Sequence, residues 1–549
     1  MNNMIPFMKY LTDESKTLIQ FYDGIIKKNK PLFDKIVNHD NHDNRKNHEN
    51  HENRKKIVNH ENHDNRKKIE KNESTTYNEF QKYIYELLQS NISLNNDDKL
   101  HATTYKNHEN TYIKVLNYAY DNHFKHNRYI DPDIKEYISL SKNPVQHAKC
   151  NLIVYKLDLF DSSDKQLIIN FFVYEDITPS LIAYLNEKVM NILLLVKVLQ
   201  TITSHNCSHN ELSLYIFMTP FKRTINTCLK GEKGEKGEKG EKEVLSAKNV
   251  NGGFCYGCTE RGEVFIMRKQ EWFKVLCHEL IHNYGVDTYI WDFMKRSSST
   301  GTSESRIYKK FINNFNLSKN INQQNANIGL QECLVEFWGE FFNNSLFAFK
   351  ISKTFAQYIT AFDNLHTYEI IHSSLQVCKI LNYNAMTFKS LLSKNTRKTK
   401  NIRHAKRPQN QTQKHIVQKN IKHTQQKTSL FNNYQERTHI FSYYILKLVL
   451  IFDYKQFINS NISLMKQANN FILNFEPSLQ NMQLFMNYMV NKGNKGNKGN
   501  NTLYKLMQLA NQEIITACKK FTKNQHSQDS SDDKIAMFSI NLRMSCCEW

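Results

Sequence analysis

The residues with the clearest chemical potential lie in one segment, residues 272–285, which contains the pattern H-E-x-x-H. His278 and His282 are four residues apart, so on a helix they project from the same face, one turn apart. Two imidazoles at this spacing can share one zinc ion. Glu279 would then lie beside the metal, where a carboxylate can accept a proton from water. The pattern predicts a zinc hydrolase site with His278 and His282 as ligands and Glu279 as catalytic base.

The residues around this pattern predict the helix that such a site needs. Apolar side chains recur at helical spacing, and Gly285 follows as a C-cap. Residues 263–268 alternate as a strand that leads into the helix. A helix whose two histidines only satisfy hydrogen bonds in the core is the alternative. The full motif on one amphipathic helix favours the metal site.

A catalytic zinc ion needs a third protein ligand and one open position. Residues 329–342 form a second apolar helical pattern that carries Glu332 and Glu336 four residues apart. Two like charges at this spacing destabilise an isolated helix, so we expect a positive partner, which a zinc ion would provide. The alternative is a helix face exposed to solvent.

At this point the chain resembles the gluzincin branch of the zincin metallopeptidases, which pairs H-E-x-x-H with a glutamate on a later helix. The segment Gln331-Glu332-Cys333-Leu334-Val335-Glu336 resembles that second motif, with Gln for Asn and Cys for Gly. The resemblance implies Glu332 as the third zinc ligand and Glu336 as the acceptor of a proton from a ligand imidazole. It also implies a peptide substrate that adds as a strand to an open sheet edge near the active helix, at residues 251–256 or 264–267.

Glu332 follows His282 by 50 residues, which is longer than usual in that family. We interpret residues 297–305 and the Asn-rich residues 316–327 as loop insertions that account for the difference. The metzincin branch is a weaker alternative, because Thr288 occupies its last ligand position and Asp287 comes one residue early.

Two further questions stay open in the sequence. Asp292 and Glu304 are weaker candidates than Glu332 for the third ligand. A donor that stabilises the oxyanion is also needed. Its candidates are Tyr368, His439, Tyr443 and Tyr444.

The segments around the motifs predict an α+β fold, with a zincin-like catalytic domain between mainly helical N- and C-terminal regions. Strands are expected at residues 152–159 and 167–174, which form a hairpin, and at 212–218, 251–256 and 263–267, with a long helix at 185–202. Helices are expected at 330–349, 354–365, 368–381, 441–457, 479–490 and 503–521, and a returning strand at 536–543. The boundaries are a helical segment 1–35, a His/Asn/Lys repeat 36–72, a helical region 73–147, the catalytic half 148–290, a helical half 291–390, a basic insertion 391–435 and a helical region 436–549.

Three low-complexity tracts interrupt these regions, at residues 36–68, 231–242 within a 230–243 insertion, and 491–500. Such tracts cannot bury a core, so we expect them to be exposed. Their use of Asn, Lys and Ile resembles that of proteins from AT-rich genomes, including large DNA viruses. The net charge is +21, and residues 394–427 carry eleven Lys or Arg without an acid. That segment could bind nucleic acid, but a solvated insertion is the simpler interpretation.

The eleven cysteines and the absence of a secretory signal predict free thiols and an intracellular protein without a membrane segment. Cys255 and Cys258 form a C-x-x-C pair, and Cys207 lies between His205 and His209. Both groups lack further ligands, so we interpret them as loop residues.

Taken together, the sequence predicts a Zn²⁺-dependent peptidase that acts on a peptide or protein. The alternatives are a catalytically degenerate zincin-like protein and a basic nucleic-acid-associated or virion structural protein.

Overall fold

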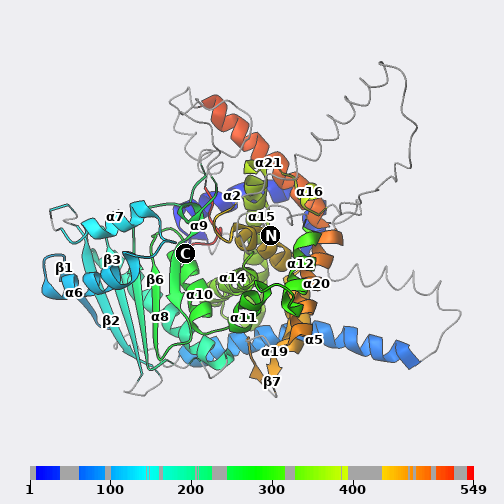
Figure 1. Ribbon diagram of the computed structural model, residues 1–549, viewed down its shortest axis with the longest axis horizontal. Helices are drawn as coiled ribbons and strands as arrows, with labels where there is room; N and C mark the ends of the chain where they lie inside the picture. The colour runs from blue at the N-terminus through cyan, green and yellow to red at the C-terminus, as the bar shows by residue number, and fades with distance from the viewer. Residues whose placement is uncertain are drawn as a thin grey trace.

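The computed structural model describes residues 8–37, 61–92, 100–143, 145–146, 149–159, 165–203, 207, 209–225, 244–315, 328–384, 386–392, 436–467, 470–473, 478–495, 502–524 and 541–549. These residues form a mostly helical α+β fold with one six-stranded mixed sheet. Figure 1 shows the sheet on one side of the molecule, the larger group of helices on the other, and α10 (Trp272–Asn283) between them.

The sheet has the strand order β1-β2-β3-β4-β6-β5. β1, β2 and β3 pair antiparallel, β3, β4 and β6 pair parallel, and β5 pairs antiparallel with β6. β5 is therefore an edge strand among the described residues. The bounds are β1 (Ala102–Lys106), β2 (Asn151–Asp158), β3 (Gln166–Val173), β4 (Glu211–Phe217), β5 (Gly253–Tyr256) and β6 (Arg261–Ile266).

Side chains alternate across the strands, so the two faces of the sheet bury different helices. One face packs Phe217 and Phe265 against α6 (Asn110–Ala119), the π-helix η3 (Tyr120–Phe124) and α7 (Pro132–Leu140). The other face packs Ile216, Val264 and Ile266 into the main core, which also contains α8 (Pro179–Ile202) and α10. Thus α10 lies on the face opposite α6.

The helical half packs around α14 (Leu330–Ile351) and α15 (Phe355–Tyr383), which are buried along most of their length. The other helices are α2 (Asp13–Lys28), α3 (Lys30–Val37), α5 (Glu61–Ile92), α11 (Thr288–Ser297), α12 (Ser303–Asn314), α16 (Phe388–Leu392), η6 (Phe441–Leu446), α18 (Lys447–Phe452), α19 (Tyr454–Met465), α20 (Leu479–Lys495) and α21 (Thr502–Asn524). The short helix α9 (Ala247–Val250) precedes β5, and a short pair, β7 (Lys466–Gln467) and β8 (Asn470–Phe471), completes the described elements.

The predicted fold class is confirmed, and so are the central hairpin, the strands β4, β5 and β6, and the helices α8, α10 and α14. Residues 354–381 form one helix rather than two, whereas 441–457 are divided among η6, α18 and α19. The strand β1 was not predicted. Residues 288–314 are largely helical, so the loop predicted at 297–305 is only a short connection between α11 and α12.

The low-complexity tracts fall mostly outside the described residues, as do residues 316–327 and the basic segment 394–427. Two tracts extend into helices, because α5 begins at Glu61 and α20 continues to Lys495. Of the strand predicted at 536–543, residues 541–543 are described, and Asn541 makes one isolated bridge to Thr224 outside the sheet. No helix in the described ranges is long and apolar enough to cross a membrane.

Candidate metal centre

The histidine pair lies on α10, which is buried between the sheet and α14. Val275, Leu276, Leu280 and Ile281 pack into the main core. The helix ends before Gly285, whose φ of 68° is the left-handed conformation that glycine adopts most easily. Because α10 is packed on both sides, its side chains can vary little in position, and the histidine pair is presented by a rigid element.

α14 approaches α10 closely at a glycine. A Cβ atom on Gly339 would lie 3.2 Å from the backbone N and Cα of His278. The absence of a side chain there therefore lets the two helices pack with their backbones close together. Glu332 and Glu336 lie on the same face of α14 as Gly339. The close packing at Gly339 therefore brings both carboxylates to the two imidazoles.

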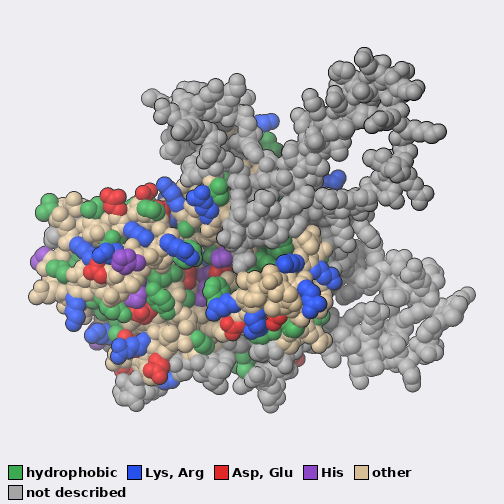
Figure 2. Space-filling view, in the orientation of Figure 1, with side chains coloured by type: hydrophobic (Ala, Val, Ile, Leu, Met, Phe, Trp, Pro, Cys, Tyr) green, Lys and Arg blue, Asp and Glu red, His purple; other side chains and the backbone are tan. Residues whose placement is uncertain are grey.

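Three side chains converge into one group. Glu332 Oε2 lies 3.5 Å from His278 Nε2 and 3.3 Å from His282 Nε2. The ligand atoms of all three residues lie within 4.8 Å of one another, so one metal ion could contact them all. The side chains of His278, Glu332 and His282 are 8%, 12% and 17% exposed, which leaves the group reachable from solvent. In Figure 2, histidine side chains come to the surface in a recess near α10.

The other nitrogen of each imidazole has its own carboxylate. His278 Nδ1 lies 2.7 Å from Glu336 Oε2, and His282 Nδ1 is hydrogen-bonded to Asp287 Oδ2 at 2.8 Å. A carboxylate at Nδ1 stabilises the tautomer that carries its proton there, so Nε2 keeps a lone pair for a metal. Both Nε2 atoms face Glu332, so the tautomers that these carboxylates favour would suit metal binding.

Glu336 also has a cation partner. It forms a buried ion pair with Lys274, which lies on α10 one turn before His278. Burial by itself raises the pKa of Glu336, but the charges of Lys274 and His278 outweigh it and hold this pKa well below its usual range. Glu336 therefore stays an anion that can accept a proton from His278 Nδ1.

The field at the group favours a positive charge. Burial lowers the pKa of His282, but the carboxylates of Asp287 and Glu332 reverse this effect and raise the pKa well above its ordinary value. Burial also acts to raise the pKa of Glu332, and the two imidazoles hold it well below its ordinary value. A field that retains a proton between these groups also attracts a metal cation, which agrees with the donor set.

Glu279 lies beside this group, against the edge strand β5. A Cβ atom on Gly253 would lie 2.9 Å from Glu279 Cγ, and the nearby Cys255 thiol acts to lower the pKa of the Glu279 carboxyl group. Burial raises the pKa of Glu279, although the charges of the two histidines act in the opposite direction. A carboxylate in this setting can both take and return a proton.

Two of the four candidate oxyanion donors lie at the group. The Tyr443 ring is 6.0 Å from the His278 ring, and burial together with the charge of Glu332 raises the pKa of its hydroxyl. A Cβ atom on Gly329 would lie 2.8 Å from His439 Nδ1 and 3.1 Å from Glu332 Cγ, so His439 is also close.

The other two candidates are engaged elsewhere. The Tyr368 hydroxyl donates to Asp23, and the Tyr444 hydroxyl donates to the carbonyl of Leu542.

The alternative third ligands do not join the group. Glu304 pairs with Arg296, and Asp292 lies 3.9 Å from Lys295 on α11. Asp287 contacts Nδ1 of His282 rather than the space between the Nε2 atoms. Sequence reasoning did not find the role of Lys274 or this role of Asp287, although the i, i+4 spacing of Lys274 and His278 on an apolar helix was a usable signal.

The prediction that all cysteines are free thiols is wrong. Cys207 and Cys258 form a disulfide, which joins the segment before β4 to the turn between β5 and β6. A Cβ atom on Gly285 would lie 2.5 Å from Cys207 Sγ and 3.0 Å from Cys258 Sγ, so the disulfide packs on the end of α10. The pairing is missed in the sequence because the two cysteines are 51 residues apart. Cys255 is a free thiol, and His205 lies outside the described residues.

No family model matches this chain, and no curated protein or solved structure matches it. The site is therefore interpreted from its own geometry, and that geometry supports a metal-binding group of two histidines and one glutamate.

Proposed function

We propose that this protein is a zinc-dependent peptidase of the zincin type. The observation that carries the proposal is the convergence of His278 Nε2, His282 Nε2 and Glu332 Oε2, with each Nδ1 atom held by a carboxylate. Two imidazoles and one carboxylate are a usual ligand set for catalytic zinc, which keeps a fourth position open. Glu279 follows a ligand directly in the chain and lies beside the group, as a general base must.

When bound, zinc would polarise the scissile carbonyl and make nearby water more acidic. Glu279 accepts a proton from that water and later passes it to the leaving amine. Its burial favours this exchange, because a raised carboxyl pKa brings the acid and base forms closer in energy at neutral pH. Tyr443 and His439 are the candidates to donate a hydrogen bond to the oxyanion.

The edge strand β5 supports a peptide as substrate. It is paired only with β6 among the described strands, and its Gly253 and Cys255 contact Glu279. An extended peptide that pairs with the free side of β5 would pass along the catalytic carboxylate. Main-chain hydrogen bonds of this kind bind a peptide whatever its side chains, so we expect a peptidase that tolerates a broad range of substrate side chains.

The test is Glu279→Gln beside Glu304→Gln, a matched change on the surface helix α12. Zinc content is measured by elemental analysis, and cleavage is measured by mass spectrometry on a mixed peptide library. We expect Glu279→Gln to keep its zinc and to lose at least about 100-fold in turnover, because general-base catalysis contributes about 10²–10⁴-fold. Glu304→Gln should match the unaltered chain.

Retained cleavage in Glu279→Gln would sink the assignment of the base. Bound zinc without cleavage in any chain would favour the degenerate zincin-like alternative. Salt-sensitive nucleic-acid binding that depends on residues 394–427, in a chain that binds no zinc, would favour the structural alternative.

A further inference from the structure

A second group of metal-ligating side chains lies outside the α10 centre. It consists of Glu369 on α15 and of Cys546 and Cys547 in the segment 541–549. Their ligand atoms all lie within 4.8 Å of one another, and all three residues are buried. None of them takes part in the proposed peptidase chemistry.

The two thiols already have the separation that a shared metal requires. Cys546 Sγ and Cys547 Sγ are 3.7 Å apart, and both cysteines are free. A disulfide would need about 2.05 Å. Two sulfurs at about 2.3 Å from a tetrahedral zinc ion are about 3.8 Å apart. The observed spacing therefore matches one edge of a zinc tetrahedron.

Glu369 can supply the third ligand without losing its present bonds. Its Oε1 accepts from the Ser545 hydroxyl at 2.5 Å and from the backbone N–H groups of Cys546 and Cys547 at 2.9 and 3.0 Å. From the backbone, its Oε2 accepts only the longer, 3.1 Å branch of the Cys546 N–H bond. Because a carboxylate oxygen has two lone pairs, Oε2 retains acceptor capacity for a cation.

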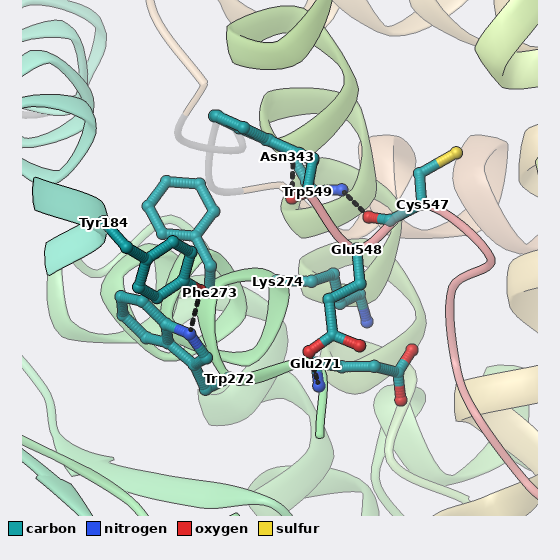
Figure 3. A pocket seen from close by; sticks show the side chains of 9 residues that line it. All are labelled: Tyr184, Glu271, Trp272, Phe273, Lys274, Asn343, Cys547, Glu548 and Trp549. Carbon is teal, nitrogen blue, oxygen red and sulfur yellow. Dashed lines mark hydrogen bonds between the residues drawn. The ribbon is translucent and has the colours of Figure 1, made fainter. Parts of the chain in front are cut away.

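The segment that carries the thiols is held from several sides. Glu271, just before α10, accepts from the backbone N–H of Ser545 at 2.6 Å, and Asn343 on α14 donates to the Cys547 carbonyl at 3.1 Å. Figure 3 shows residues 547–549 lying over the start of α10, with the Cys547 thiol turned away from the pocket there. The thiols are thus preorganised, which lowers the entropy cost of binding.

The local charge also favours a cation. Glu369 is buried beside the carboxylate of Glu340. The nearby Lys447 is already paired with Glu340 at 2.7 Å. No lysine or arginine of the described chain approaches Glu369 within ion-pair distance. A bound cation would therefore stabilise the ionised form of Glu369.

We propose that Cys546, Cys547 and Glu369 bind a second, structural zinc ion that joins the segment 541–549 to α15. Two thiolates select borderline and soft cations such as Zn²⁺ over Mg²⁺ or Ca²⁺. Binding would form two Zn–S bonds and one Zn–O bond and leave the fourth position to a non-protein ligand; the two thiol protons, and the carboxyl proton of Glu369 where it is protonated, would pass to solvent. The site is independent of the proposed peptidase activity.

The test counts zinc in the full chain and in three variants: Cys546→Ser with Cys547→Ser, His282→Ala, and the control Cys378→Ser. Cys378 is a buried free cysteine on the same helix as Glu369. We expect two tight zinc ions in the unaltered chain and in the control, and one in each of the other two variants. Weak binding to other histidines contributes equally to the unaltered chain and the paired-serine variant, so the difference between them is informative.

Cobalt substitution needs no variant and therefore covers the case in which the paired-serine chain fails to fold. Thiolate ligands give Co²⁺ an intense near-ultraviolet charge-transfer band, which nitrogen and oxygen ligands do not give. We expect this band in the unaltered chain and in His282→Ala. Its absence, or a paired-serine chain with undiminished zinc, would overturn the second site and leave the α10 centre standing. Loss of zinc only from the paired-serine chain would support the second site and remove the basis of the proposed peptidase.

Discussion

The contact between Asp287 and His282 offers the sharpest test of the α10 centre. Asp287→Asn keeps the size of the side chain and one acceptor oxygen, but it removes the negative charge at His282 Nδ1. The two atoms are 2.8 Å apart and the Asp287 side chain is only 9% exposed, so solvent screens this hydrogen bond little. The change therefore weakens the orientation and basicity of one ligand without removing that ligand.

The expected magnitude follows from the hydrogen bond. A bond to a charged partner contributes about 1.5–3 kcal/mol and a neutral one about 0.5–1.5 kcal/mol. The difference, about 1–1.5 kcal/mol, corresponds to about a tenfold loss of zinc affinity. This lies at the lower end of the 10–100-fold range that is typical of such partners. Asp287→Ala also removes the acceptor oxygen, so its loss of zinc affinity should lie towards the upper end of that range.

The assay is a competition titration of the metal-free chain against a chromogenic zinc chelator at fixed pH, in which the binding step that His282→Ala abolishes reports the α10 centre. Asp292→Asn is the control, because Asp292 lies nearby on α11 with its side chain 49% exposed and does not contact the group. We expect Asp292→Asn to bind zinc as the unaltered chain does. If Asp287→Asn also bound zinc with unchanged affinity, the dependence of His282 on that carboxylate would be refuted.

Three further predictions concern the supports of α10. Lys274→Met leaves Glu336 buried without its lysine partner and should lower the free energy of unfolding of the metal-free chain, measured in urea, by about 3–5 kcal/mol. Adding Glu336→Leu should recover most of this loss, and no recovery would contradict the pairing. Gly339→Ala should push α14 from α10, cost about 1–3 kcal/mol and lower the Tm; an unchanged Tm would show that the helices can separate freely. Cys207→Ser should cost up to about 4 kcal/mol, given the 51-residue separation, and reductant should destabilise the Cys207→Ser chain less than the unaltered chain.

The elements that position the α10 centre were predictable because their signals are local. The alternation in β5 and β6 and the helical spacing in α10 and α14 are properties of short stretches, and the structure confirms each of them. The pairing of Glu332 with the histidines needed only two motifs on two helices. Tyr443 and His439 could be proposed by residue type, but the choice between them and Tyr368 or Tyr444 depended on tertiary packing.

The rest depends on long-range contacts that leave no periodic signal. The strand β1 is exposed along most of its length, so it lacks the apolar alternation that identifies a strand. The disulfide between Cys207 and Cys258 and the packing of the segment 541–549 against α15 each join residues that are distant in the chain. Side-chain chemistry suggests such pairs only after the fold has brought them together.

The charges along α14 connect these observations to the metal. Glu332, Glu336 and Glu340 follow one another at four-residue intervals on a buried helix, where unpaired carboxylates would be costly. Lys274 pairs with Glu336, and Lys447 pairs with Glu340. Among the described residues, Glu332 has only the two imidazoles as ion-pair partners. The charge of Glu332 must therefore be balanced either by a proton shared with a histidine or by a metal cation. The carboxylates at both Nδ1 atoms favour the metal cation, because they leave the Nε2 atoms free to bind it. The helix thus has two carboxylates neutralised by lysine and a third whose surroundings suit a metal.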